Sequence, residues 1–362
     1  MLYVLIAILM FGALIALHEF GHFAAAKLCG VKVNEFAIGM GPRLLHKKKG
    51  ETEYSLRALP IGGFCAMEGE EEGKSSDPRA FPNRPWWHRL IILVAGVFMN
   101  FLTGFVIILC LFAGAEGFQT TEITEVRADA MAYTQGLQGG DRVVELDGHA
   151  TYFPGDVSLF LSRVTGDRVE MTVERQGERL DLTIDLTTYT DEETGGERRM
   201  LGIVMGGWEK ATPWAKLRNS WYQAVDYVRL VWVSLGDMVR GKVGLRDMSG
   251  VVEITHVMAQ AGEQGAQAAQ EAGSSALLGA LTNILDFVAF ISINLAVMNL
   301  LPIPALDGGQ IFFMAVNGVL MKVRGRPLDP KYQGWVSAAG FLLLMGLMLL
   351  VTVSDIAKLL GA

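Results

Sequence analysis

The chain has 362 residues, of which 51% are hydrophobic and 19% are charged, and its formal net charge is −7. This composition is too apolar for an ordinary soluble protein and too charged for one that lies wholly within a membrane, so we expect membrane spans together with an aqueous domain. The segment 114–275 carries 25 acidic and 15 basic residues. This acidic balance excludes nucleic acid as a partner.

Four apolar segments reach the length of about 18 to 20 residues that a helix needs to cross a bilayer. In chain order they cover residues 1–26, 90–113, 277–301 and 335–353. Four spans place both termini on one side of the membrane. The loop 27–89 carries eleven Lys and Arg residues and the loop near 322–331 carries four, so the positive-inside rule predicts that both loops are cytosolic. The termini and the segment 114–275 are then extracytoplasmic.

The first apolar segment leads into the sequence His18-Glu19-Phe20-Gly21-His22. Residues four apart lie on one face of a helix, so both histidines can bind one metal ion while Glu19 lies beside them. This pattern is typical of zinc hydrolases, in which a carboxylate takes a proton from the attacking water. One alternative is a chance match, which the cost of ionisable groups in an apolar segment opposes. The other is a cleaved signal peptide, and no Lys or Arg precedes the stretch to support it.

Two stretches of the first loop, 36–42 and 60–64, combine alternating apolar residues with glycine and proline. Such stretches predict a small β hairpin. The hairpin is either an ordinary cytosolic one or one that dips towards the membrane beside the active site. In the second case its edge could pair with an extended substrate strand.

The segment 118–207 is predicted to form a separate α+β domain. Its stretch 137–148, which contains Gly140 and Asp141, resembles the core of PDZ domains, and strands are expected near 168–175 and 180–186. A PDZ domain binds an extended peptide as an added strand, and a folded domain at this place could equally act as a steric filter.

The segment 208–275 is expected to form extracytoplasmic linker helices. From Trp214 onward, apolar residues recur at three- and four-residue steps, which predicts an amphipathic helix. This helix lies either on the membrane surface or packed within the domain before it. The stretch 259–273, rich in Ala and Gln, predicts a loop or a frayed helix.

The third apolar segment ends with prolines at 302 and 304 and two glycines after Asp307. Irregular backbone at membrane depth must be buried in protein or line a cavity, so this stretch should face the other spans. The predicted topology brings it to the cytosolic depth of the histidines, which makes Asp307 a candidate third ligand. The alternative is that Asp307 caps the helix that follows. An aspartyl protease fits less well, because Asp286 and Asp307 lie on one segment and no GxGD motif follows.

Taken together, an HExxH motif in the first span, an NxxPxPxLDGG stretch in a later span and a PDZ-like domain between them resemble the site-2 protease family of intramembrane zinc metalloproteases. The resemblance covers essentially the whole chain and is closest to the bacterial branch that cleaves anti-sigma factors and remnant signal peptides. It implies Zn²⁺ as cofactor, Glu19 as general base, and residues that shape the site and hold substrate. The implied metal ligands are His18, His22 and Asp307, and the implied substrate-binding residues are Asn294, Asn299, Pro302 and Pro304. The two asparagines could instead join spans by hydrogen bonds.

The sequence thus predicts a polytopic α-helical membrane protein with about four transmembrane helices, an inserted extracytoplasmic α+β PDZ-like domain and a small membrane-associated β-hairpin region. Its expected parts are 1–117, 118–207, 208–275 and 276–362. The expected function is hydrolysis of peptide bonds in transmembrane segments of single-pass proteins, such as anti-sigma factors or signal-peptide remnants. We expect the protein in the bacterial inner membrane, with the active site near the cytosolic side. The alternative is a catalytically inactive scaffold that binds exported proteins through the PDZ domain.

Overall fold

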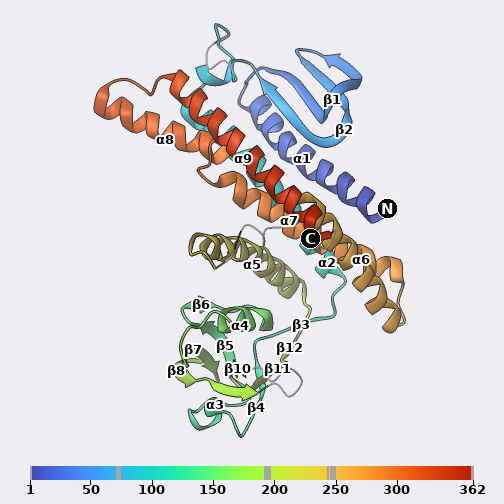
Figure 1. The fold of residues 1–362 in the computed structure, drawn as a ribbon, viewed down its shortest axis with the longest axis vertical. Helices are drawn as coiled ribbons and strands as arrows, with labels where there is room; N and C mark the ends of the chain where they lie inside the picture. Colours follow the sequence, from blue (N-terminus) through green and yellow to red (C-terminus); the bar gives the residue numbers. More distant parts are fainter. Residues whose placement is uncertain (1, 71–74, 191–196, 243, 245–249, 360–362) are drawn as a thin grey trace. The chain divides into compact units, whose positions relative to one another are not determined.

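The computed structural model describes residues 2–70, 75–190, 197–242, 244 and 250–359. The chain divides into two compact units (Figure 1). The first unit comprises residues 1–111 and 223–362, and the second comprises residues 112–222.

The first unit is mainly helical, as the long apolar segments predict. In chain order its helices are α1 (Leu2–Leu28), α2 (Trp86–Ala113), the second half of α5 (Pro213–Val239), α6 (Val251–Glu271), α7 (Ala276–Leu300), α8 (Asp307–Arg324) and α9 (Pro330–Leu359). Among the described residues, four helices are long and apolar enough to cross a membrane. Their spanning parts are Ile8–Leu28, Trp86–Ala113, Ala276–Leu300 and Lys331–Lys358. These are the four segments that the hydropathy pattern predicts.

The loop between α1 and α2 contains an antiparallel hairpin of two strands, β1 (Val33–Lys49) and β2 (Thr52–Met67). β2 runs close to α1, because a Cβ added at Gly12 would lie only 2.4 Å from the Pro60 carbonyl oxygen. Several large apolar side chains on the two strands remain exposed in this structure. They are Ile38, Met40, Leu44, Leu45, Leu56 and Leu59. Such a surface fits a hairpin that touches the membrane, which stays a prediction.

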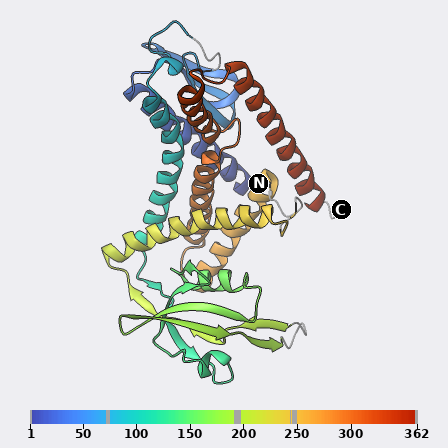
Figure 2. The ribbon, with the colours of Figure 1, turned by 90° about the vertical axis from the view of Figure 1, so that its left-hand side faces the viewer.

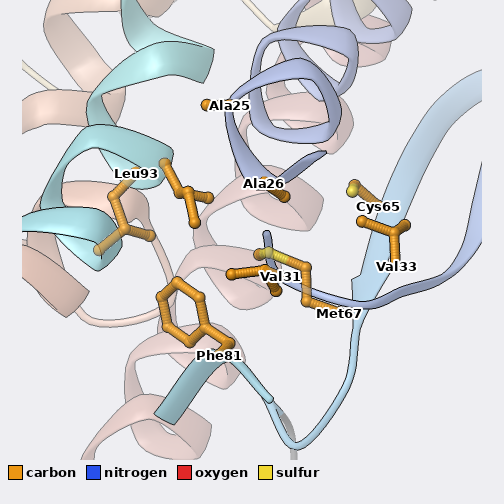
Figure 3. Packing of buried hydrophobic residues seen from close by; sticks show 9 residues of the cluster. Ala25, Ala26, Val31, Val33, Cys65, Met67, Phe81 and Leu93 are labelled. Atoms are coloured by element: carbon orange, nitrogen blue, oxygen red, sulfur yellow. The ribbon is translucent and has the colours of Figure 1, made fainter. Parts of the chain in front are cut away.

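Two of the apolar clusters formed by the described residues join elements of the helical unit. The first, drawn in Figure 3, joins the end of α1, the hairpin, a short 3-10 helix (Phe81–Asn83) and α2. Its members include Ala26, Val31, Val33, Met67, Phe81 and Leu93. The second joins α1, α6 and α7. Its buried members are Leu14, Met258, Ile284, Val288 and Ile291. The first cluster fixes β2 and α2 beside the end of α1 that carries the histidines.

The helices α5 and α6 both pack against α7. On α5, the Tyr227 hydroxyl donates a hydrogen bond of 2.7 Å to Asp286 of α7, which engages this carboxylate away from the histidines. The interpretation of 259–273 as a loop or frayed helix is wrong, because α6 is continuous from Val251 to Glu271 and only the last two residues of the stretch lie beyond it. The reason is a close helix crossing: a Cβ added at Gly265 would lie 2.3 Å from the Gly279 carbonyl oxygen. Glycine has a low helix propensity, but at this crossing the missing side chains allow the two helices to approach each other.

In its described residues, the second unit consists of short strands, two short helices and the first part of α5. Its strands are β3 (Gly117–Gln119), β4 (Ile123–Val126), β5 (Arg142–Leu146), β6 (His149–Ala150), β7 (Arg168–Arg175), β8 (Glu178–Asp185), β9 (Thr187–Thr190), β10 (Glu197–Met200), β11 (Ile203–Met205) and β12 (Trp208–Lys210), and its helices are α3 (Met131–Thr134) and α4 (Pro154–Leu161). The largest sheet has the order β6-β5-β7-β8. Figure 2 shows the strands of this unit in shades of green. Smaller pairs join β11 to β4, β10 to β9 and β12 to β3. The pairing of β12 with β3 extends this unit beyond residue 207.

Candidate metal centre

The two histidines lie one turn apart on α1. The side chains of His18 and His22 are both buried, and their Nε2 atoms are 3.1 Å apart. The run of apolar residues before them favours a helix that is stabilised by packing or by a membrane rather than by charge pairs. The helical period therefore brings the imidazoles together without help from the rest of the chain.

The third member, Asp307, is the first residue of α8. Ala305 has a positive φ of 79°, which turns the chain back after α7 ends. Gly308 and Gly309 then allow a close approach: an added Cβ would lie 2.2 Å from the Leu301 carbonyl oxygen and 2.3 Å from the Ile303 carbonyl oxygen, respectively. The two glycines thus let α8 begin against the end of α7, with the Asp307 side chain directed at the histidines.

These three side chains fit a tetrahedral metal ion. The Oδ2 atom of Asp307 lies 3.3 Å from Nε2 of His18 and 3.3 Å from Nε2 of His22. Zinc binds nitrogen and oxygen ligands at about 2.0–2.1 Å, so tetrahedral ligands stand about 3.3 Å apart. Oδ2 of Asp307 is also buried without a hydrogen bond of regular geometry, which an ion between the three atoms would explain. Two imidazoles and one carboxylate leave a fourth position for water.

The helix α2 contributes to the site, although the sequence pattern assigned it no role. The carbonyl of Ile92 lies 2.8 Å from Nδ1 of His22. Because a carbonyl can only accept, Nδ1 of His22 carries the hydrogen and its Nε2 lone pair is free for a metal. Gly96 faces the same ring, and a Cβ added there would lie 2.3 Å from Nε2 of His22. Gly21 allows the helices to approach, because a Cβ added there would lie 2.4 Å from the Ala95 carbonyl oxygen.

Glu19 lies next to the histidines and is positioned by the hairpin. Its carboxylate faces the backbone N–H of Cys65 on β2. A Cβ added at Gly63 would lie 3.5 Å from Cγ of Glu19, in ordinary contact. The carboxylate faces a cavity of about 750 Å³. The side chains around this cavity include His18, Glu19, His22, Phe64, Asn299 and Asp307.

The structure brings some of the predicted substrate-binding residues to this cavity and not others. Asn299, in the last turn of α7, is at its wall. Asn294 lies earlier on α7, and Pro302 and Pro304 lie in the turn between α7 and α8; these three are not part of the wall. Pro304 instead contacts α9, because a Cβ added at Gly340 would lie 2.5 Å from its Cβ.

Two further polar residues at the cavity wall carry no sequence signal. Glu70 follows β2, and burial raises the pKa of its carboxyl to about 7, although His22 and a hydrogen bond from Gln310 of α8 act in the opposite direction. In the sequence Glu70 belongs to the acidic run 68–72, a pattern typical of a solvated loop. The packing of this turn against α8 brings Glu70 to the cavity wall.

Comparison with known proteins identifies the family. The model of peptidase family M50 matches residues 6–347. A Clostridium acetobutylicum protein, named as an inferred zinc metalloprotease, is 37% identical over 98% of this chain and 97% of its own. The regulator of sigma-W protease RasP of Bacillus subtilis is 26% identical, with 97% of each chain covered. Among solved structures, the PDZ domain of an SdrC-like protein from Listeria monocytogenes matches 24% of this chain and 88% of its own, with 22% identity and a TM-score of 0.21. The chain therefore belongs to peptidase family M50, which confirms the predicted site-2 protease family and the predicted enzyme class, a metalloprotease.

Proposed function

We propose that this protein is a zinc-dependent intramembrane endopeptidase that hydrolyses peptide bonds in transmembrane segments of other proteins. The observation that carries the proposal is the group of His18, His22 and Asp307 at metal-binding distances. Glu19 lies beside this group, and both histidines belong to the candidate membrane span Ile8–Leu28. Zinc is the cofactor, in agreement with relatives such as the zinc metalloprotease RasP of Shouchella clausii, which is 28% identical to this chain.

The residues of the cavity have separate tasks in this reaction. Zinc in a site of this kind supplies Lewis acidity. The carboxylate of Glu19 takes the proton of the attacking water and passes it to the nitrogen of the leaving amide. Asn299 offers an amide that can both donate to and accept from the backbone of an unwound substrate helix. Unwinding is required because a helix hides its peptide bonds in its own hydrogen bonds.

We place the reaction at the bacterial inner membrane, with the histidines towards the cytosolic side and the unit 112–222 outside. The positive charge of the loop 27–89 supports this orientation. The substrates we propose are single-pass proteins, either anti-sigma factors or remnants of signal peptides. The name of the Bacillus subtilis relative, a regulator of sigma-W protease, supports the first class.

Two substitutions test the assigned roles. Glu19→Gln should keep stoichiometric zinc and abolish cleavage, because the amide preserves size but cannot take a proton. Asp307→Ala should lose zinc and cleavage together, because it leaves two ligands. The measurement is the zinc content of purified protein by mass spectrometry, alongside cleavage of a reporter with one transmembrane segment. Near wild-type cleavage by Glu19→Gln would contradict the mechanism, and full zinc in Asp307→Ala would remove Asp307 from the site. An inactive scaffold predicts no cleavage by any variant.

A further inference from the structure

The face of α2 towards the metal site consists of residues spaced four apart. Ile92, Gly96 and Asn100 follow one another along this face. Ile92 offers its carbonyl to His22, Gly96 approaches both rings, and Asn100 lies opposite His18. The two helices run in opposite directions at this contact, so the earlier residue of α2 meets the later histidine of α1 and the later residue meets the earlier histidine. One helix thus contacts both imidazoles.

Asn100 is an unusual residue for its place. It is 1% exposed on a candidate membrane span whose neighbouring residues are apolar. Its side-chain amide lies 3.2 Å from Nδ1 of His18, and the other polar atom of the amide is buried without a partner among the described residues. The contact between α2 and α7 does not use this side chain, because Ser292 Oγ donates to the backbone carbonyl of Asn100, at 2.7 Å. Among the described residues, the hydrogen bond to His18 is therefore the one polar contact of this buried amide.

The chemistry of the site decides which way this amide faces. A histidine that binds a metal through Nε2 carries its hydrogen on Nδ1. The group opposite Nδ1 must then accept a hydrogen bond. The nitrogen and oxygen of an amide are exchanged by a simple rotation, and their positions are assigned from the surrounding hydrogen bonds. An Asn100 that donated to Nδ1 would instead require the hydrogen on Nε2, where the metal has to bind.

We propose that Asn100 is a positioning residue of the metal site, whose Oδ1 accepts the N–H of His18 Nδ1 and holds the Nε2 lone pair towards the ion. The Ile92 carbonyl does the same for His22. α2 thereby sets the tautomer and the orientation of both imidazole ligands before the metal binds. Loss of such a partner typically weakens metal binding by about 10- to 100-fold.

The inference rests on the proposed metal site, so the test reads metal affinity rather than proteolysis. Zinc affinity of the full-length protein in detergent is measured by competition with a chromophoric chelator for wild type, Asn100→Leu and Asn100→Asp. Leucine has a similar volume and no acceptor, whereas the Asp carboxylate can still accept from Nδ1–H. The matched control is Thr103→Val on the same helix, where the hydroxyl donates to the Met99 carbonyl of its own helix.

We expect Asn100→Leu to bind zinc about 10- to 100-fold more weakly, and Asn100→Asp and Thr103→Val to stay within about threefold of wild type. Wild-type affinity in Asn100→Leu would overturn the proposal, as would an equal loss in Asn100→Asp. If Asn100→Leu does not fold, ¹⁵N spectra of histidine-labelled, zinc-loaded wild type provide the test: His18 should show a protonated Nδ1, and coordination through Nδ1 would overturn the proposal. A wild-type protein that binds no zinc refutes the metal site itself.

Discussion

Substitution of Gly96 by alanine should damage the metal site while favouring the helix that carries it. The added Cβ would lie 2.3 Å from Nε2 of His22 and 2.9 Å from Cε1 of His18, whereas ordinary contact begins at 3.4 Å. The shortfall at His22 is about 1.1 Å. His22 is held by its hydrogen bond to the carbonyl of Ile92, which lies on α2 together with Gly96. The added Cβ must therefore either break this hydrogen bond or push α2 away from α1.

A misplacement of about 1 Å in a catalytic group typically costs about 100-fold in rate. Alanine is favoured over glycine within a helix by about 0.5–1 kcal/mol, so the loss should not come from a weaker helix. We therefore expect Gly96→Ala to keep its helix content, to bind zinc at least about tenfold more weakly and to cleave a reporter about 100-fold more slowly.

The matched control is Gly318→Ala on α8, where an added Cβ meets nothing within 4 Å. Helix content is measured by circular dichroism, zinc affinity by chelator competition, and rate by cleavage of a reporter with one transmembrane segment. Gly318→Ala should match wild type in all three. Wild-type zinc affinity and rate in Gly96→Ala would refute the proposed closeness of α2 to the histidines.

Three further predictions concern the second unit and the topology. Burial alone would raise the pKa of Asp141, but hydrogen bonds from Arg175 and the Gln138 N–H hold the pKa below its usual value. Asp141→Asn should therefore destabilise residues 112–222 at pH 7 by about 1.5–3 kcal/mol. In urea unfolding, this difference in stability should shrink as the pH falls below about 3.9, because the native charge interaction is lost there. A cysteine at Lys48 should react with an impermeant reagent only from the cytosol, and one at Arg163 only from outside; the opposite pattern would invert the topology. Replacing residues 118–207 by a short flexible linker should leave zinc bound and allow cleavage of untrimmed substrates, and a stable deletion variant that cuts only pre-trimmed substrate would exclude a steric filter.

Local patterns were sufficient for the features that depend on one stretch of chain. The number of candidate spans follows from apolar length, because a bilayer sets a minimum. The pairing of His18 with His22 follows from the helical period, since residues four apart share a face. Asp307 could be named as a candidate because the prolines before it and the two glycines after it break a helix there, although the sequence alone left a helix cap as an equal alternative. The structure places its carboxylate 3.3 Å from both histidines.

The surroundings of these side chains depended on contacts between distant segments. Nothing in the local pattern of α2 shows that Ile92 and Asn100 face residues 70 and 82 positions earlier in the chain. The polar Asn100 within an apolar span was the one available signal. Likewise, Cys65 supports Glu19 through its backbone, which carries no side-chain signature. The sequence also failed to predict that α6 is helical beyond residue 259, because Gly265 is favourable there only through the close approach of another helix. Periodicity reports which face a residue occupies, and only the tertiary structure decides what that face meets.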